Sequence, residues 1–414
     1  MVIPRRLFLS ASGQAVLWSL VGNHVLADNY PTGWGPEGSM PMQTSYEDYL
    51  IGNFSGGFEK MYPTSIVRAS GAGKPLRTAK TKLKSSTIAE IKKFQVAKKK
   101  PAFLVAKNEA LVFENYEFER TSTMRFHGKS LTKSVLSLLC GAAFDNGILG
   151  SLDDPIQKYE PRLSNNPLGK IKIRHALNMS SGADICAGKP FFCGERNDGV
   201  RLTFSGFEGK GPKRPLQVFK ITDMEKAVLN WSYGTRTDQG VEYNYNSLDP
   251  HLIGMVLRAA SKQSISQLLE QLIWQPMGAQ FDATFLTDSK GVEELAGGFN
   301  ANAVDWLRLG VLVAQNGKIN GRQVVSQKWF EEIRKLRPDE KYLDKDGSKA
   351  TAYQGYKFFF RRPYKSSKIL LMQGAHGQNL WTDTDSGIAM LALSVTNDYG
   401  SYEKLFKRIR SDLA

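Results

Sequence analysis

Strand-like and helical segments follow one another in a definite order along this chain, and that order limits the folds it can adopt. Hydrophobic runs bounded by glycine and charged turns lie at residues 101–116 and again at 353–396, as is typical of strands. Between them, residues 130–310 repeat apolar side chains mostly at helical spacing. Strands at both ends and helices in the middle predict an α+β fold.

Individual elements can be placed within this outline. Residues 101–114 predict a β-hairpin, because two apolar runs flank the polar turn Lys107-Asn108-Glu109. A final helix is expected from about 402 to 413, after four strands at 353–360, 369–372, 378–382 and 388–395.

The start of the chain has the character of a targeting segment. Two arginines, Arg5-Arg6, precede a mildly apolar stretch over 11–26, and Val25-Leu26-Ala27 offers small residues for cleavage. This pattern predicts a twin-arginine signal peptide over residues 1–27 and a periplasmic or secreted protein. An uncleaved anchor is the alternative, although polar residues interrupt the apolar stretch.

Residues 28–100 differ in composition from the rest of the chain and are expected to form an N-terminal extension. From Arg68 to Lys100 there are eleven Lys or Arg residues and a single acid, Glu90, which accounts for ten of the fifteen net positive charges of the chain. A solvated, mobile face is the favoured interpretation, and a patch for an anionic cell-envelope surface is the alternative. Nucleic acid is not expected as a partner, because Phe94 is the single aromatic side chain among these cations.

A serine and a lysine three residues apart stand at the start of a helical pattern. Gly128 interrupts the chain just before Ser130, and Lys133 then precedes the apolar run 135–139. Ser130 is therefore expected at a helix N-terminus, with Lys133 one turn further on the same face. A lysine whose pKa is lowered by burial and by the helix dipole can take the proton of a serine, and the Ser130 amide can donate to a developing oxyanion. Chance matches also occur, since Ser401 and Lys404 have the same spacing.

A tyrosine-rich segment is a second candidate for chemistry. Residues 242–254 include Tyr243 and Tyr245 directly before an apolar helical pattern. A tyrosine at such a junction can point its phenol into a cleft and act as a base if lysines lie nearby. The alternative is that both tyrosines are ordinary core residues.

The three cysteines suggest structural roles. Cys186 and Cys193 lie close together in a glycine-rich loop and could close a small disulfide ring in an exported protein. Cys140 falls on the apolar face of the Ser130 helix, where a buried thiol is expected. No Cys or His pairs have the spacing of a zinc site, so neither a metal nor another cofactor is expected.

These motifs together resemble the serine β-lactamase and penicillin-binding protein superfamily, on the class C side, which also holds esterases, D-aminopeptidases and 6-aminohexanoate-dimer hydrolases. The resemblance covers residues 101–414. The segments that carry it, in order, are Ser130–Lys133, Leu152-Asp153-Asp154-Pro155, 175–182, the tyrosine segment, Pro276-Met277-Gly278 and 373–378. It implies a β-lactamase-like fold, with an antiparallel sheet flanked by helices (residues 101–129 and 353–414), a mainly helical subdomain (130–310) and a cleft between them.

The resemblance also implies roles for individual residues. Ser130 matches the acylated nucleophile, Lys133 its partner base and Tyr245 the tyrosine of the family's Tyr-x-Asn box, with Tyr243 left open as an alternative. Asn246 and Ser247 would then contact the substrate. A serine at the third position of this box is similar to the 6-aminohexanoate-dimer hydrolase branch.

The family's Lys-Thr-Gly strand falls at residues 375–377, where the lysine is absent. His376 could partly replace that cation in holding a substrate carboxylate, and Gly377 would also line the substrate site. The Gln378 amide would be the second oxyanion donor beside the Ser130 amide.

The resemblance implies an exported serine hydrolase that cleaves a small-molecule amide or ester through a Ser-Lys-Tyr acyl-enzyme mechanism. A β-lactamase or D-Ala-D-Ala carboxypeptidase is one alternative, although the missing lysine weakens it. A non-catalytic cell-wall binding protein on the same scaffold is the other. An α/β-hydrolase has no support, because the chain lacks a G-x-S-x-G motif.

Overall fold

The computed structural model describes residues 50–71, 73, 75–184, 196–197, 200–201, 223–232, 234–335, 355–363 and 368–414. The expected signal peptide and the expected Cys186–Cys193 disulfide both lie outside these ranges. Within them, no helix combines the length and apolar character that crossing a bilayer requires.

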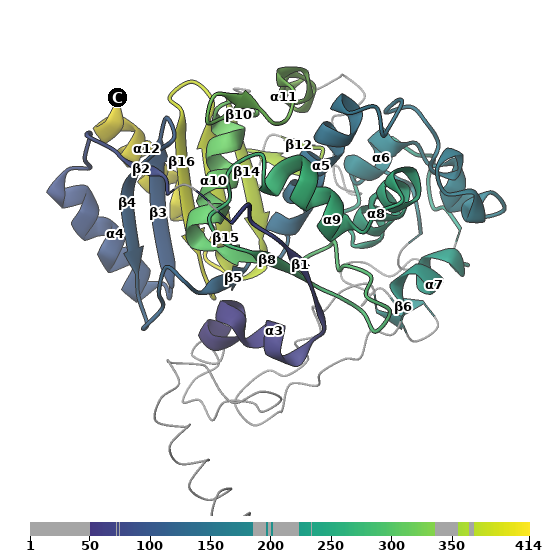
Figure 1. Ribbon diagram of the computed structural model, residues 1–414, viewed down its shortest axis with the longest axis horizontal. Coiled ribbons are helices and arrows are strands. Elements are labelled where there is room, and N and C mark those ends of the chain that lie inside the picture. Colours follow the sequence, from purple (N-terminus) through teal and green to yellow (C-terminus); the bar gives the residue numbers. More distant parts are fainter. Residues whose placement is uncertain are drawn as a thin grey trace, which may run out of the picture.

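A large sheet built from both ends of the chain forms the centre of the described structure (Figure 1). Its strand order is β12-β13-β14-β15-β16-β3-β4-β2, and every neighbouring pair is antiparallel except β2 with β4. The first strands are β2 (Arg77–Thr78), β3 (Ala102–Lys107) and β4 (Ala110–Tyr116). The later ones are β12 (Gly355–Lys357), β13 (Phe360–Arg362), β14 (Ile369–Gly374), β15 (Gln378–Asp383) and β16 (Ile388–Leu393). The predicted α+β class and antiparallel sheet are confirmed.

Alternation along each strand gives the sheet two apolar faces. On β16, Ala389 and Leu391 join one core cluster, whereas Met390 and Ala392 join another. Helix α10 (Ala303–Ala314) covers the first face; its Gly310 lies so near that an added Cβ would touch Leu380. Helices α4 (Ser85–Ala97) and α12 (Tyr402–Leu413) cover the second face (Figure 1). Burial on both faces makes the sheet a rigid support for the residues at its ends.

The basic segment before residue 101 contributes to this same body. Strand β2 extends the sheet beside β4, and Ile91 of α4 is buried against the core that α12 also covers. The remaining surface of α4 carries the exposed Lys92 and Lys93. The exposed lysines dominate the composition of this segment. The sequence therefore did not reveal that its apolar residues, such as Ile91, are part of the core.

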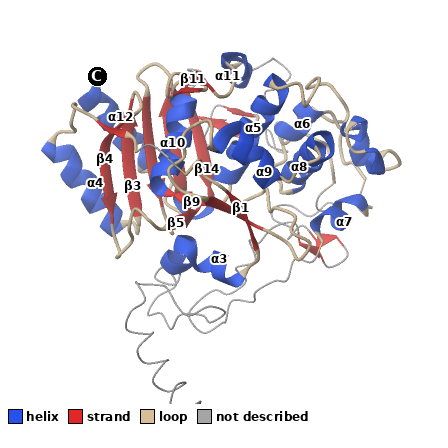
Figure 2. Ribbon diagram, in the orientation of Figure 1, coloured by secondary structure: helices blue, strands red, loops and turns tan. Residues whose placement is uncertain are grey.

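The remaining described elements form the helical part and a second sheet (Figure 2). The second sheet has the order β1-β8-β9-β5, was not predicted, and consists of β1 (Thr64–Val67), β5 (Arg125–His127), β8 (Ala283–Leu286) and β9 (Phe299–Asn302). The further helices are α3 (Phe58–Met61), α5 (Leu131–Asp145), α6 (Ile173–Leu177), α7 (Met224–Leu229), α8 (Leu248–Ser261), α9 (Ile265–Leu269) and α11 (Gln327–Arg334). Short helical turns span Asn53–Gly57, Ile156–Lys158, Pro161–Leu163, Pro167–Lys170, Glu270–Trp274 and Ala375–Gly377, and two-residue strand pairs are β6 (Arg196–Asn197) with β7 (Val200–Arg201) and β10 (Lys318–Ile319) with β11 (Arg322–Gln323).

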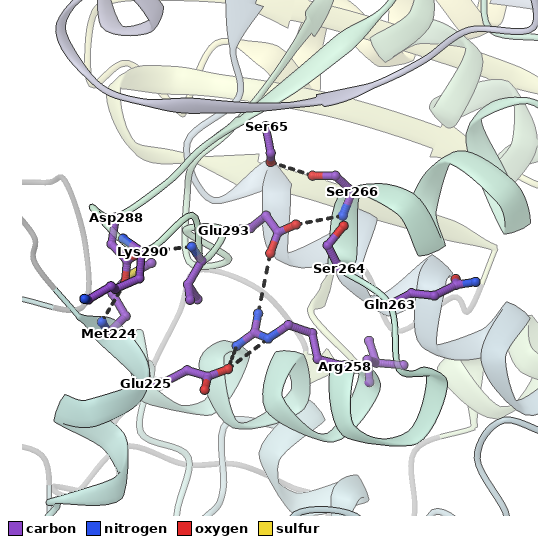
Figure 3. Close-up of polar contacts among 12 residues, drawn as sticks. Ser65, Met224, Glu225, Arg258, Gln263, Ser264, Ser266, Asp288, Lys290 and Glu293 are labelled. Carbon is purple, nitrogen blue, oxygen red and sulfur yellow. Dashed lines mark hydrogen bonds and ion pairs between the residues drawn. The ribbon is translucent and has the colours of Figure 1, made fainter.

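A buried polar network joins several of these elements (Figure 3). The Arg258 guanidinium on α8 donates to Oε1 of Glu225 at 3.0 and 2.7 Å and lies 3.6 Å from Oε2 of Glu293. Glu293 also accepts from the Ser266 amide at 2.9 Å, and the Ser266 hydroxyl pairs with that of Ser65 on β1 at 2.6 Å. The loop that carries Glu293 is therefore bonded to α8 and α9, and α9 in turn is bonded to β1 through Ser266.

Candidate active site

Ser130 lies at the N-terminus of α5, as predicted. It is the residue that immediately precedes the helix, with φ −66° and ψ −1°, and the helix continues to Asp145. Two neighbours fasten this end: Thr132 donates to the Lys129 carbonyl at 2.7 Å, and the Phe299 amide donates to the Thr132 hydroxyl at 3.1 Å. The hydroxyl of Ser130 thus stands at the positive end of a helix whose position is set by β9.

Lys133 is one turn further along α5 and points back at the serine. Its side chain is 3% exposed, and Nζ donates to Oγ of Ser130 at 3.1 Å. Nζ also donates to the carbonyl oxygen of Ala296, towards which Ser130 Oγ points at 3.5 Å. The spacing predicted this contact between serine and lysine, in which Lys133 is buried and Ser130 is partly exposed.

The Ala296 carbonyl was not predicted as part of the site. It belongs to the loop between β8 and β9, in which the Ala296 amide donates to the Glu294 carboxylate at 2.9 Å. Glu293, one residue earlier, is the acid that Arg258 and Ser266 hold in Figure 3. A backbone acceptor has no side-chain signature, so only the folded structure could bring it to Lys133.

Tyr245 is the tyrosine that adjoins Lys133. The Lys133 ammonium lies 4.9 Å from the centre of the Tyr245 ring, within cation–π range. Tyr243 instead is 7% exposed and packs on Tyr356 with ring centroids 5.2 Å apart. The Arg361 guanidinium, which the sequence did not single out, lies 5.5 Å from the centre of the Tyr245 ring. The structure thus places Ser130 and the Tyr245 ring on either side of Lys133, and Tyr245 stays the predicted catalytic tyrosine.

A second lysine is buried next to the serine. Burial lowers the pKa of Lys129 to about 8, an effect that nearby Lys133 reinforces and Glu294 opposes. Its Nζ lies over the rings of Phe54 and Phe58, at 5.2 and 5.0 Å from their centres. These phenylalanines come from the N-terminal extension, which therefore forms part of the wall behind the nucleophile.

His376 does not replace the missing cation of the family's Lys-Thr-Gly strand. Burial, together with the charge of Lys129, lowers the pKa of His376 to about 4, so the imidazole is neutral at pH 7. Its ring packs on Phe54 at 5.3 Å between centroids. A neutral ring against Phe54 offers no positive charge, and a contact of His376 with a substrate carboxylate stays a prediction.

The hairpin after β14 meets the backbone of the serine at Gly374. A Cβ added to Gly374 would lie 3.0 Å from the Ser130 amide nitrogen and 2.5 Å from the Gly128 carbonyl oxygen. Gln378 is paired with Gly374 across the hairpin, and its side chain is committed to Ser394. Gly374 thus packs against the Ser130 backbone, whereas the role of the Gln378 amide as an oxyanion donor stays a prediction.

Asn246 and Gly377, two further residues expected to contact the substrate, make hydrogen bonds within the protein. The Asn246 side chain accepts from the Asp249 amide at 2.7 Å and donates to the Asn244 carbonyl and the Asp249 carboxylate, so it orders the start of α8. The Gly377 carbonyl accepts from Asn379 and from Tyr402 at 2.9 and 2.8 Å. Ser247 is partly exposed at the helix start and stays a predicted substrate contact.

Cys140 is the described cysteine, and it is buried in α5 as expected. Burial raises the pKa of its thiol. Among the described residues, no group of His, Cys, Asp and Glu has the arrangement of a metal site.

The sequence is similar to those of known proteins. The Beta-lactamase family model matches residues 99–414. The chain is 24% identical over 298 residues to the 6-aminohexanoate-dimer hydrolase of Paenarthrobacter ureafaciens, covering 70% of this chain and 72% of that protein.

Solved structures match the fold at lower identity. A Bacillus anthracis protein provisionally named as a 6-aminohexanoate-dimer hydrolase superposes with a TM-score of 0.71 at 17% identity, covering 93% of this chain and 96% of that one. EstCE1, described as a hydrolase with promiscuous acyltransferase activity, superposes with a TM-score of 0.58 at 16% identity, covering 80% and 98%.

The chain therefore belongs to the beta-lactamase family, since the family model spans most of its length. It is a beta-lactamase-family serine hydrolase, and its homologues are hydrolases of amides and esters.

Proposed function

We propose that this protein hydrolyses a small linear amide or ester through an acyl-enzyme on Ser130. The observation that carries the proposal is the contact of Lys133 Nζ with Ser130 Oγ at 3.1 Å, at a helix N-terminus and beside the Tyr245 ring. A serine held by a buried lysine at such a position is the arrangement that nucleophilic catalysis requires.

The reaction has two steps. The hydroxyl proton passes to Lys133 and Tyr245 while Ser130 Oγ forms a bond to the substrate carbonyl carbon. The bond from that carbon to the leaving nitrogen or oxygen breaks, and Tyr245 returns the proton to the leaving group. Water then attacks the ester on Ser130, gives its proton to the same base pair, and releases the acid with the serine restored.

The negative charge that forms on the carbonyl oxygen needs backbone donors. The Ser130 amide is one, and we assign the second to the backbone that follows Gly374, because Gly374 is the hairpin residue next to that amide. Each such donor is worth on the order of 3 kcal/mol in the transition state. The Gln378 amide stays the alternative in the same role.

Two observations favour a linear amide over a β-lactam. The detected relative in Paenarthrobacter ureafaciens is a 6-aminohexanoate-dimer hydrolase. The cation that the family's Lys-Thr-Gly strand would supply for a substrate carboxylate is absent, and the neutral His376 does not provide it.

The test is a substrate panel on the purified protein. The 6-aminohexanoate linear dimer, p-nitrophenyl acyl esters and nitrocefin are assayed with the wild type, Ser130→Ala and the control Ser401→Ala, which alters the other S-x-x-K match. Turnover of the dimer or the esters that Ser130→Ala abolishes and Ser401→Ala retains is the expected result. Nitrocefin as the fastest substrate would reassign the protein as a β-lactamase, and activity unchanged in Ser130→Ala would remove the mechanism.

We also propose that the chain is exported and that its basic segment contacts the cell envelope. Arg5-Arg6 in front of an apolar stretch supports twin-arginine export, which predicts that Arg5→Lys with Arg6→Lys retains the protein in the cytoplasm of a bacterial host. The exposed lysines of α4 support binding to an anionic envelope surface. Sedimentation with phosphatidylglycerol vesicles, compared with phosphatidylcholine vesicles, tests the second proposal.

A further inference from the structure

The turn Ala375–Gly377 between β14 and β15 is held from two sides. At its start, Gly374 meets the backbone of Gly128 and Ser130 at the candidate nucleophile. At its end, a Cβ added to Gly377 would lie 2.8 Å from Ser394 Oγ and 3.3 Å from Lys100 Nζ. The turn thus lies between the active serine and a group of buried polar side chains behind the sheet.

Lys100 is at the centre of that group. It is fully buried, and Nζ donates to Ser394 Oγ at 2.8 Å and to Thr396 Oγ1 at 3.0 Å. Its ammonium also lies 5.4 Å from the Phe94 ring centre and 5.2 Å from the Tyr402 ring centre. Both hydroxyls have their own protons engaged, since Ser394 donates to the Thr396 carbonyl and Thr396 to the Lys98 carbonyl. They can therefore only accept from Lys100.

Gly377 needs this neighbourhood to be ordered. Its φ of 77° favours glycine, and its backbone passes so near the Thr396 carbonyl that no side chain would fit. Its carbonyl accepts from the Tyr402 hydroxyl at 2.8 Å. At the next residue back, the His376 amide donates to Asn397 at 3.0 Å. The segment 394–402, which Lys100 ties together, thus holds the turn along its length.

Burial brings the titration of the Lys100 amine close to neutral pH. Burial lowers the pKa of Lys100 to about 7, with Lys98 acting in the same direction and Asp398 opposing. Tyr402 is uncharged, because burial raises the pKa of its phenol. A neutral amine still has two N–H groups, which matches the two hydroxyl acceptors.

We propose that Lys100 is a positioning residue of the active site. By binding Ser394 and Thr396 behind Gly377, it fixes the turn so that the backbone after Gly374 stays beside the Ser130 amide, where the oxyanion forms. The inference rests on the proposed function, because the position of this turn affects a rate only if Ser130 is the nucleophile. It adds to that function a residue from the basic extension, distant in the sequence from the other residues assigned to the site.

The test compares Lys100→Met with Lys98→Met, a lysine at the same corner that pairs with Asp398 on the surface. A misplaced oxyanion donor weakens transition-state binding more than ground-state binding. Lys100→Met should therefore lower kcat at least tenfold with KM within about twofold, and should weaken inhibition by an arylboronic acid by a similar factor. Lys98→Met should retain the wild-type values.

Tyr402→Phe is the second variant, in case Lys100→Met folds poorly. It removes a single hydroxyl from the Gly377 carbonyl, and a threefold or larger fall in kcat at unchanged KM is expected. Rates and boronate affinity at wild-type level in folded Lys100→Met or Tyr402→Phe, even with a lower Tm, would overturn the inference. The proposed function would still hold after that result if Ser130→Ala is inactive. If Ser130→Ala keeps the wild-type activity, both the proposed function and the role of Lys100 are ruled out.

Discussion

Lys133 donates from Nζ to Oγ of Ser130 at 3.1 Å, whereas Lys404, at the same spacing from Ser401, is exposed on α12. Ser401 instead donates to the Asp398 carboxylate at 3.2 Å. Two identical spacings therefore have different outcomes, and burial is what separates them. Lys133 lies between the Ala296 carbonyl and the Tyr245 ring, which hold its amine next to the Ser130 hydroxyl.

This contrast gives a matched pair of lysine variants. Lys133→Met should lower kcat by about 10²–10⁴-fold and slow labelling of Ser130 by a fluorophosphonate, because the serine loses its base. Lys404→Met should change neither quantity. Equal labelling rates in the two variants would show that Lys133 is not the base.

Replacing Tyr245 and replacing Tyr243 are expected to have different effects on kcat. Tyr245→Phe should reduce kcat by about 100-fold or more, since its ring adjoins Lys133 and its hydroxyl is the proposed proton donor to the leaving group. Tyr243→Phe should act mainly on the Tm, because that ring packs in the core on Tyr356. Steady-state kinetics with a p-nitrophenyl ester and thermal unfolding measure the two effects, and the reverse order would favour Tyr243 as the catalytic residue.

Gly374 offers a test of the hairpin register. Gly374→Ala places a methyl group 2.5 Å from the Gly128 carbonyl oxygen and 3.0 Å from the Ser130 amide, so either the hairpin or the serine must shift. A fall in kcat of tenfold or more is expected. Gly400→Ala is the control, because a Cβ there meets open space. Wild-type turnover in Gly374→Ala would place the second oxyanion donor elsewhere.

Lys100 should affect stability as a function of pH. Its pKa is about 7 in the folded protein and 10.5 in the unfolded chain, so the unfolded state binds more protons between these values. Wild-type stability must then rise with pH relative to Lys100→Met within that window, by roughly 1–3 kcal/mol from pH 7 to pH 9. Urea unfolding at both pH values measures the difference. Parallel profiles for the two proteins would show that the buried amine does not lose its proton.

Glu293 anchors the loop that carries the Ala296 carbonyl. Glu293→Gln places a neutral amide beside Arg258 in a buried position. The unfolding free energy should fall by about 1–3 kcal/mol, and kcat should fall by a factor that corresponds to less energy than this. Glu403→Gln removes the exposed pair with Lys407 and should cost about 0.5 kcal/mol or less. Similar costs for the two variants would mean that the network in Figure 3 does little to hold the loop.

Much of the fold could be predicted from patterns within short segments of the sequence. The strands at 369–374, 378–383 and 388–393 and the helix Tyr402–Leu413 follow the expected ranges closely, because alternation and helical spacing are properties of short segments. Ser130 and Lys133 were found for the same reason, since both belong to one helical turn.

Features that depend on distant pairing could not be obtained in this way. The offset between Gly374 and Gln378 is set by how β14 pairs with β15, and a stretch with two glycines is compatible with more than one register. Lys129 meets Phe54 and Phe58 only because the extension folds back on α5. The Ala296 carbonyl is backbone, which every residue has.

The order of strands also bears on how the protein is made. Strand β3 lies between β4 and β16, and β16 comes much later in the chain, at Ile388–Leu393. The half of the sheet that supports the serine therefore cannot close until residues 388–393 have been synthesised, and until then one edge of the apolar strand at 102–107 lacks its partner.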